Sequence, residues 1–583
     1  MESAHGKPLA DFQNPQQEPG TEKRLLLVFA LTFLIILASQ PLLKKYGLQP
    51  TEPTRQQTQN VPATPAAPEA AATPPPAAST AGSRQASSES ETVVENDVYR
   101  IRFTNRGGQV KSWVLKKFKD DKGQPLELVH AAAADKYGYP LSLWSYDESL
   151  RNKLNSVLYA RGGESSGDTL SPPAELSFEY ADSDVSVRKT FHFDDSYVVK
   201  VETSVVQKGS EITALPMWPA GFGDETTATS YAASRIEYQN GNDVERIALK
   251  KVLGGNTIRG PFQWGGVSDQ YFAAIFMPED PASAVLVTLH GSLDNPQDAK
   301  HPNDVLGAAA GRLGGATVAR MYVGPKALDV LETVAVAGLP AGADPDLRKL
   351  VDFGWLGYIA RPLFLWLKWT YNHMVHNWGW AIAIQTLIIS LLLSPLRFMQ
   401  QKSALEMQRV APHIKSIQEK YKKYSMGDPR KRQMQEEIAA VYKEHGVNPA
   451  AGCLPLLIQM PFLFAYYRML GVALDLRFAH WLWIKDLSAF DPYYILPIFL
   501  VASMFLMQRM TPMTGMDPAQ QKMMMFTMPI MMGFIFRFLA AGLNLYYAES
   551  NLISIIQQAI LNRTKTGQEM RRLAEKRARK KDK

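Results

Sequence analysis

The chain has 583 residues, of which 46% are hydrophobic and 20% charged, and its formal net charge is +7. This length allows two or three domains, and the single cysteine, Cys453, excludes a disulfide within the chain. The basic excess gathers beside the longest apolar runs and in residues 563–583, which favours contact with anionic lipid or RNA over general nucleic-acid binding.

The first apolar run, residues 25–43, follows Lys23 and Arg24. It is close to the roughly 20 residues that cross a bilayer, and no A-x-A cleavage motif follows it, so we interpret it as an uncleaved anchor rather than a signal peptide. Residues 1–24 would then be cytoplasmic. Residues 44–91 are rich in Pro, Ala, Ser and Thr and predict a disordered linker, because they cannot bury enough apolar surface to fold.

Residues 92–340 contain short runs in which apolar and polar residues alternate, namely VYRIRF, QVKSWVL, VSVRKTFHF and YVVKVETSVV. A period of two places one face inside and one outside, which predicts an antiparallel β domain, a large sandwich. Residues 341–376 form an interfacial segment, with an amphipathic helix over 346–376 that is rich in Trp and Tyr. Its two histidines, His373 and His376, lack a third ligand nearby, so we predict no metal site.

Five apolar segments follow, and each predicts a membrane helix: residues 378–394, 453–470, 492–510, 521–540 and 543–561. The fold class is thus an α+β membrane protein with a five-helix core over 377–562. Six spans in total place both termini on one side of the membrane. The positive-inside rule assigns the basic segments 397–447, 509–522 and 563–583 to the cytoplasm, although Lys44 and Lys45 then fall outside against the rule.

Residues 397–447 interrupt the core and predict a cytoplasmic helical hairpin. Its helices cover residues 398–424 and 429–445, and Gly427 and Gly446 end them. Asp428 is the expected N-cap of the second helix, with Pro429 at its first position. A docking arm for a partner such as the ribosome is one interpretation, and a solvated hairpin is the other. The basic tail could likewise bind ribosomal RNA or anionic lipid head groups.

The sequence contains no H-E-x-x-H metal motif, no phosphate-binding glycine loop and no cysteine cluster. We therefore predict that the protein is not an enzyme and has no cofactor. A secondary transporter with an external ligand-binding β domain is the alternative. Transporters are built from inverted repeats, which we do not find here, and transport does not explain the long hairpin.

Two polar faces run along the first and last spans of the core. Polar groups within membrane helices are costly, so such faces need a reason. Two of them predict a hydrated groove for substrate, while polar contacts between packed helices are the alternative. The face of the first span consists of Gln385, Thr386, Ser390, Ser394 and Arg397, and that of the last span of Tyr547, Asn551, Ser554 and Gln558.

Apart from the basic segment 509–522 at the span ends, the charged residues inside predicted spans are Arg468, Arg537 and Glu549. Arg537 and Glu549 lie on either side of a predicted turn at residues 541–542, and their depths differ by about 4–5 Å. We predict an ion pair between them, with Arg468 as the alternative partner of Glu549, because pairing neutralises a costly carboxylate. In the competing interpretation both arginines extend to the membrane surface and Glu549 stays protonated.

Three segments resemble the YidC insertase family: VNPAAGCLPLLIQMPFLFAYYRML (residues 447–470), DLSAFDPYYILPI (486–498) and GLNLYYAESNLISIIQQ (542–558). The resemblance extends to the whole layout and implies a periplasmic β-supersandwich and a hydrophilic groove open to the cytoplasm. Through such a groove nascent membrane proteins enter the inner membrane, alone or beside the Sec translocon, without enzymatic activity. By position, Thr386, Tyr546 and Tyr547 match family residues that line the groove and meet substrate.

The chain departs from this family at one position. Many bacterial members carry a basic residue five positions before a Pro-Leu pair at the end of this span, and here that position is Ser390, before Pro395 and Leu396. Arg397 lies about 10 Å further along the helix on the same face. Helical side chains tilt toward the N-terminus, so Arg397 is our candidate for the groove charge. A phosphate-binding arginine at the membrane surface is the alternative.

Overall fold

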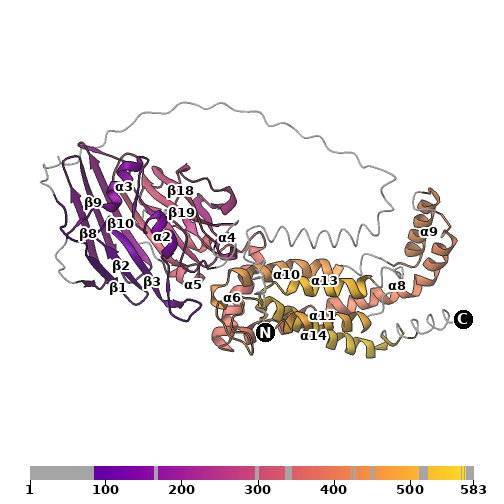
Figure 1. Ribbon diagram of the computed structural model, residues 1–583. Helices are drawn as coiled ribbons and strands as arrows, with labels where there is room; N and C mark the ends of the chain where they lie inside the picture. The colour runs from indigo at the N-terminus through magenta and orange to yellow at the C-terminus, as the bar shows by residue number, and fades with distance from the viewer. Residues whose placement is uncertain are drawn as a thin grey trace, which may run out of the picture.

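The computed structural model describes residues 84–162, 168–226, 228–295, 301–334, 345–421, 423–424, 428–447, 454–510, 523–565, 567–569 and 572. It contains a β-rich part followed by a helical part (Figure 1). The predicted anchor, the linker up to residue 83 and most of the basic tail lie outside the described residues. The predicted linker boundary at residue 91 is wrong, because the backbone of Arg84 already pairs with that of Ala181.

The described strands form three sheets, which are antiparallel except where β1 pairs with β7. The first has the order β4 (Pro125–Glu127), β3 (Gln109–Lys119), β2 (Tyr99–Thr104), β1 (Glu91–Glu95) and β7 (Thr169–Leu170). The second has the order β14 (Asp243–Ala248), β13 (Arg235–Asn240), β16 (Trp264–Ser268), β17 (Phe272–Pro278), β20 (Thr317–Pro325), β10 (Val198–Gln207), β9 (Val185–Phe193), β8 (Ala174–Ala181) and β6 (Ala160–Gly162), with β11 (Ser210–Glu211) on β10. The third has the order β15 (Thr257–Arg259), β18 (Ala284–Leu293), β19 (Asn303–Arg312), β12 (Leu215–Trp218) and β5 (Leu143–Trp144).

Short helices connect and cover these strands. They are α2 (Ala131–Tyr137), α3 (Glu148–Ser156), α4 (Ala228–Ala232), the 3₁₀ turn η2 (Leu249–Lys251) and α5 (Leu328–Thr333). The four alternating runs of the sequence form β2, β3, β9 and β10. In β2 the side chains of Tyr99, Ile101 and Phe103 are buried and those of Arg100 and Arg102 are exposed, as a period of two requires.

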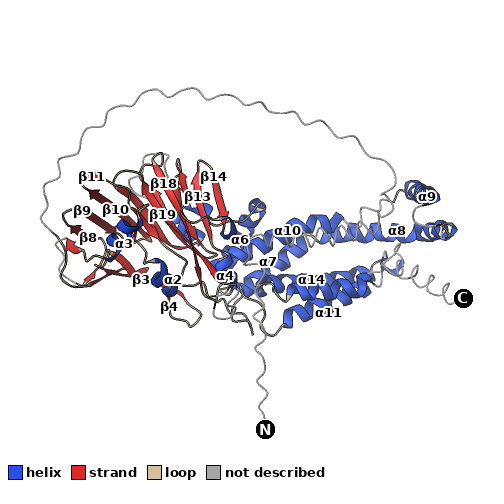
Figure 2. Cartoon of the chain, turned by 45° about the horizontal axis from the view of Figure 1, so that its top comes forward, coloured by secondary structure: helices blue, strands red, loops and turns tan. Residues whose placement is uncertain are grey.

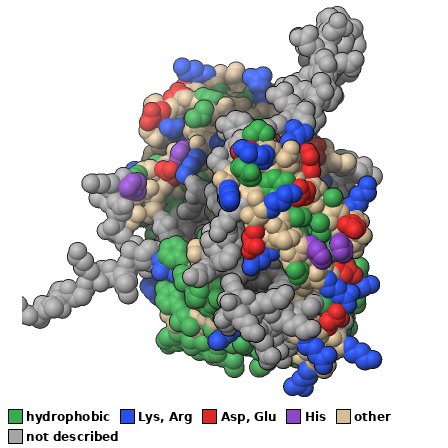
Figure 3. Space-filling view, turned by 90° about the vertical axis from the view of Figure 1, so that its right-hand side faces the viewer, with side chains coloured by type: hydrophobic (Ala, Val, Ile, Leu, Met, Phe, Trp, Pro, Cys, Tyr) green, Lys and Arg blue, Asp and Glu red, His purple; other side chains and the backbone are tan. Residues whose placement is uncertain are grey.

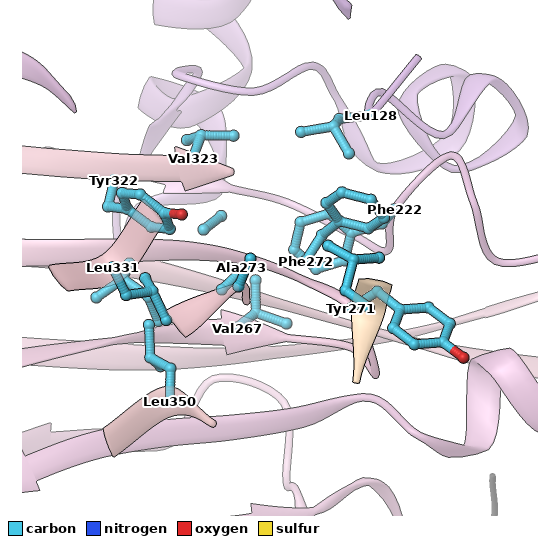
Figure 4. Close-up of a cluster of buried hydrophobic side chains, with 14 of the residues drawn as sticks. Leu128, Phe222, Val267, Tyr271, Phe272, Ala273, Tyr322, Val323, Leu331 and Leu350 are labelled. Carbon is cyan, nitrogen blue, oxygen red and sulfur yellow. The ribbon is translucent and has the colours of Figure 1, made fainter. Parts of the chain in front are cut away.

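Aromatic side chains join the sheets into one core. The rings of Phe103 on β2 and Phe191 on β9 lie 5.1 Å apart, and those of Trp113 on β3 and Trp218 on β12 lie 6.1 Å apart. Figure 4 shows a further region of this core, where the side chain of Leu331 from α5 lies close to that of Tyr322 from β20. The β-rich part thus has layered sheets with a continuous apolar interior.

Lys189 on β9 is fully buried within this core. Its Nζ donates to the backbone oxygens of Gly107 (2.9 Å), Gly108 (2.7 Å) and Leu141 (2.6 Å). Burial lowers the pKa of Lys189 to about 7. Both glycines have positive φ angles, 67° and 53°, which suit a turn of this kind. The lysine therefore fastens the turn between β2 and β3 to the central sheet.

The helical part extends away from the sheets, and α8 and α9 lie at its far end (Figures 1 and 2). We call this far end the hairpin end and the other the sheet end. Helix α14 packs against both α7 and α11, and α10 packs against α6. The elements are η3 (Leu347–Leu350), α6 (Gly357–His373), α7 (Trp378–Leu392), α8 (Ser394–Lys420), α9 (Arg430–Glu444), α10 (Leu454–Val472), η5 (Leu474–Leu476), α11 (Ile495–Met510), the π-helix η6 (Met523–Thr527), α13 (Met528–Phe536) and α14 (Ala541–Arg563).

Each predicted span corresponds to a helix of the structure: α7, α10, α11, the pair η6 and α13, and α14. Among the residues that the structure describes, no helix combines the length and the apolar character that crossing a membrane requires. Seen from the hairpin end, the molecule carries Lys, Arg, Asp and Glu side chains over much of its surface, and hydrophobic side chains gather at the lower edge (Figure 3).

Two further predicted boundaries are wrong. The amphipathic helix predicted from Asp346 begins only at Gly357, because Gly354 adopts a φ of 69° and its N–H is held by Asp352 Oδ1 at 3.0 Å. The span predicted to end at residue 540 ends at Phe536. The turn predicted at residues 541–542 therefore comes earlier, and those residues already begin α14.

The two helices predicted for the hairpin are α8 and α9. They bury an apolar contact of their own, which includes Val410 and Ile414 from α8 and Met434 and Ile438 from α9. Asp428 Oδ1 accepts a hydrogen bond from the Arg430 N–H at 2.9 Å at the start of α9. The hairpin is therefore a packed unit rather than two independent helices.

Candidate functional site

Gln385 connects three helices in the middle of the helical part. Its side chain is fully buried. Its Nε2 donates to the backbone oxygen of Leu363 on α6 at 2.9 Å, and its Oε1 accepts a hydrogen bond from the Tyr466 hydroxyl on α10. A buried amide with both ends paired is stable in an apolar surrounding. Gln385 thus fixes α7 against α6 and α10.

The rest of the predicted α7 face is also largely buried. Thr386 Oγ1 donates to the Ile382 oxygen of its own helix at 2.7 Å. The Ser390 backbone oxygen accepts a hydrogen bond of 3.2 Å from Gln557 Nε2 on α14. The predicted face of α14 includes Gln558 but not Gln557, which makes this bond. The two glutamines are adjacent in the sequence, and this is the feature from which Gln557 could have been predicted. The bond between Gln557 and Ser390 joins the two helices that carry the predicted faces.

The tyrosine pair of α14 lies at the sheet end of its helix. The Tyr546 ring stacks on that of Tyr466 at 4.1 Å, and the Tyr547 ring contacts that of Phe536 on α13 at 4.7 Å. The structure therefore brings Tyr546, Tyr466 and Gln385 into one cluster. We call these three residues the Tyr466 cluster.

Further along α14 the polar face does not turn only toward α7. Asn551 Nδ2 donates to Ser503 Oγ on α11 at 3.1 Å. Ser554 Oγ donates to the Ser550 oxygen of its own helix at 2.5 Å. Gln558 Nε2 donates at 2.9 Å to an acceptor one turn later in α14, Asn562 Oδ1. The Asn551 bond joins two packed helices, as the alternative to a hydrated groove predicts, whereas the other two bonds lie within α14.

The exposure of this polar face changes from α7 to the start of α8, where Ser394 lies. The side chains of Gln385 and Thr386 are 0% exposed and that of Ser390 is 6% exposed, whereas Ser394 is half-buried. The face is therefore covered at the sheet end and less covered toward the hairpin end. Arg397 lies in α8, and its side chain is outside the described residues.

The three predicted intramembrane charges do not form one group. Arg468 forms an ion pair with Asp352, and its predicted alternative pair with Glu549 stays a prediction. The Arg537 guanidinium lies 4.4 Å from the Phe534 ring centre. Glu549 Oε2 is buried without a hydrogen-bond partner among the described residues. The pair of Arg537 with Glu549 stays a prediction.

We expect substitution of Gly379 by alanine to weaken the packing at the start of α7. An added Cβ would lie 2.1 Å from the Trp481 indole. Overpacking of this degree costs about 3 kcal/mol, which exceeds the roughly 1 kcal/mol that alanine contributes to helix propensity. Thermal unfolding of the purified protein should show the loss. Gly357→Ala is the control, because its Cβ would meet Phe353 only at 3.4 Å, and equal stability of the two variants would contradict the packing argument.

Comparison with known proteins assigns both parts of the chain. Residues 91–366 match the family model of the YidC periplasmic domain, and residues 369–569 match that of the 60Kd inner membrane protein. The chain is 32% identical to the membrane protein insertase YidC of Syntrophus aciditrophicus, over 93% of this chain and 99% of the relative. It is 31% identical to that of Haemophilus influenzae, over 93% and 97%.

A crystal structure of an active YidC insertase with its first transmembrane domain resolved has 19% identity and a TM-score of 0.34, covering 83% of this chain and 94% of that one. The relatives are inner-membrane proteins with a periplasmic domain, and their family inserts proteins into the membrane without enzymatic activity. The alternative of a secondary transporter has no support among them. The chain belongs to the YidC family of membrane protein insertases.

Proposed function

We propose that the chain receives nascent membrane proteins along the polar face of α7 and α14 and releases them sideways into the bilayer. The observation that carries this proposal is the change in exposure from α7 to the start of α8, from fully buried Gln385 and Thr386 to half-buried Ser394. A face of this kind is closed toward the sheets and accessible from the hairpin end, which is the cytoplasmic end in the proposed topology.

The driving force of this step is the transfer of apolar side chains to lipid. Each Leu, Ile or Phe at the centre of a membrane helix contributes about −0.3 to −0.6 kcal/mol, while the polar flank of the substrate must cross the hydrocarbon. Hydroxyl and amide groups such as those of Ser394 and Gln558 would hydrate that flank and so shorten its path through lipid. No bond is cleaved in such a mechanism.

The proposed topology has an N-terminal anchor, five spans in the helical part and both termini in the cytoplasm, with the β-rich part in the periplasm. The packed hairpin of α8 and α9 and the basic tail then face the ribosome and are its proposed contacts. We place the Sec translocon beside the helical part as a second route for the same substrates. The separate apolar contact of the hairpin supports its use as a docking arm.

Photo-crosslinking tests the position of the substrate. A light-activated amino acid at Ser394 or at Gln558 should attach to the hydrophobic segment of a ribosome-bound small membrane protein. The same probe at Leu392, which is 76% exposed on the outer surface of α7, serves as the control and should capture lipid instead. Equal capture of the nascent chain at all three positions would contradict a defined path along the polar face.

We expect Arg397→Ala to weaken the insertion of substrates with acidic flanks. Loss of about 1 kcal/mol of charge attraction lowers the insertion of the most acidic flank about fivefold. The measurement compares substrates with a graded number of acidic residues, using protease protection of newly made protein. Arg409→Ala is the matched control, since Arg409 lies on the same helix and already pairs with Glu569 at 2.7 Å. An unchanged profile in Arg397→Ala would reject the role of this arginine.

A further inference from the structure

Asp352 contacts three elements, β13, β14 and α10, at the junction between the β-rich part and the helices. Its Oδ1 accepts a hydrogen bond from the Gly354 N–H at 3.0 Å, which shapes the chain before α6. Its Oδ2 lies 3.2 Å from Arg235 Nη1 on β13 and 4.0 Å from Arg246 Nε on β14. The same oxygen pairs with Arg468 Nη2 on α10. The carboxylate of Asp352 thus binds both the second sheet and a helix of the helical part.

The surroundings of Asp352 keep this carboxylate charged. Burial acts to raise the pKa of Asp352, but the positive charges of Arg468, Arg246 and Arg235 outweigh it and hold the pKa below its usual range. The two strand arginines are themselves held by Glu237, whose side chain is fully buried and whose Oε2 lies 3.1 Å from Arg246 Nε. The attraction between opposite charges is stronger when they are partly removed from water than at a surface. The attraction between Asp352 and its arginines is therefore stronger than that of an exposed ion pair.

Arg468 lies close in the sequence to the part of α10 that belongs to the Tyr466 cluster. The Tyr466 hydroxyl donates to Gln385, and its ring stacks on that of Tyr546. A second bond near the same end of α10 also comes from the β-rich part, because Gln270 Nε2 donates to the Gly471 oxygen at 2.8 Å. The sheet end of α10 is therefore attached to the β-rich part at two points.

We propose that Asp352 is a positioning residue for insertion, which fixes the depth and rotation of α10 through Arg468 and so keeps the Tyr466 cluster assembled. A shift of one residue along a helix moves a side chain by 1.5 Å and turns it by about 100°. Either movement would break the hydrogen bond to Gln385 and the ring stacking with Tyr546. The inference rests on the proposed substrate face of α7 and α14, which the Tyr466 cluster adjoins.

A second ion-pair cluster at the same junction offers a matched control. Lys368 Nζ on α6 lies 3.1 Å from Asp329 Oδ1 and 3.5 Å from Asp475 Oδ1. Asp329 belongs to α5 of the β-rich part, and its partner is on α6 rather than α10. Asp329→Asn therefore removes a carboxylate charge from the junction without touching Arg468. Asp352→Asn also keeps an oxygen that can accept from the Gly354 N–H, so it removes the charge but not the turn.

The test measures the attachment of α10 and the activity of the protein in the same membranes. The full chain carries Cys453→Ser together with Gln270→Cys and Gly471→Cys, and an added Cβ at Gly471 has no atom within 4 Å. A short bifunctional thiol reagent then reports how closely α10 is held to the β-rich part. Insertion of a small test membrane protein is followed by protease protection.

We expect Asp352→Asn to lower both the cross-linking rate and the insertion rate severalfold, Asp352→Glu to restore much of both, and Asp329→Asn to change neither. Unchanged cross-linking in Asp352→Asn would overturn the attachment, and lower cross-linking with unchanged insertion would overturn the positioning role. If Asp352→Asn does not accumulate, Arg468→Gln gives the same test, because Asp352 keeps its two strand arginines. A failure of the proposed substrate path gives a different result from a failure of the Asp352 proposal. In that case the parent double-cysteine protein would cross-link normally, but a nascent chain would make no contact at Ser394.

Discussion

Lys189→Met is expected to lower the free energy of unfolding of the β-rich part by about 3 kcal/mol. The substitution leaves the backbone oxygens of Gly107, Gly108 and Leu141 without the Nζ donor that they share. Each buried polar group left unpaired costs about 1–3 kcal/mol, and the apolar methionine side chain offsets part of the sum. In a domain of this size the loss lowers the melting temperature by about 6–12 °C. Thermal unfolding can be followed by the fluorescence of the buried tryptophans.

The control is Lys200→Met on the neighbouring strand β10. Lys200 Nζ lies 2.6 Å from Glu202 Oε1, but both side chains are about one-third exposed, so the pair contributes less than about 1 kcal/mol. A loss in Lys189→Met no larger than that in Lys200→Met would contradict the role of the three carbonyl contacts.

The pH dependence of stability provides a second readout for Lys189. Its pKa is lowered to about 7 in the folded protein from 10.5. Between these two values the unfolded chain binds more protons than the folded one, so stability rises with pH in this window. Lys189→Met removes this contribution, and its free energy of unfolding should rise less steeply between pH 7 and pH 10 than that of the parent protein.

The second large effect is expected at Gln385. Gln385→Leu leaves the buried Tyr466 hydroxyl without its acceptor and removes the second hydrogen bond of the Leu363 oxygen, which keeps its bond within α6, and this loss costs about 1–3 kcal/mol. We expect lower thermal stability and, because α7 loses its polar contacts with both α6 and α10, a loss of insertion. Stability is measured on the purified protein in detergent and insertion in membranes that lack any other copy of the insertase.

A double-mutant cycle separates the Tyr466 bond from the rest. Tyr466→Phe removes the hydroxyl but keeps the ring that stacks on Tyr546. The double variant Gln385→Leu with Tyr466→Phe should lose less stability than the sum of the two single variants, by about 1 kcal/mol. Strict additivity would show that the two side chains do not stabilise the protein through each other.

The sequence predicts the β-strands well because burial in a sheet imposes a period of two. Tyr99, Ile101 and Phe103 alternate with Arg100 and Arg102, and each lies on the expected side of β2. The helices of the helical part are equally predictable, because a long apolar run has few structural alternatives to a helix. The ends of these helices are less predictable. The start of α6 depends on the Asp352 contact with Gly354, which periodicity does not reveal.

Helical periodicity predicts which residues share a face but not which neighbour that face meets. Asn551 has the spacing of the predicted face, yet its partner is Ser503 on α11 rather than a residue of α7. Arg468 is a sharper case. Its partner Asp352 is 116 residues earlier in the chain and belongs to the junction with the β-rich part. Within the predicted spans Glu549 is the only carboxylate, so the sequence offers Arg468 no other partner there.

The hairpin of α8 and α9 has a consequence for biosynthesis. Its apolar contacts, such as those among Val410, Ile414, Met434 and Ile438, all join residues close in sequence. Local contacts form quickly and need no distant part of the chain. The hairpin can therefore fold as soon as it emerges during translation, while α10 to α14 are still being made. A newly synthesised insertase would thus present its folded hairpin before its own last helices are complete.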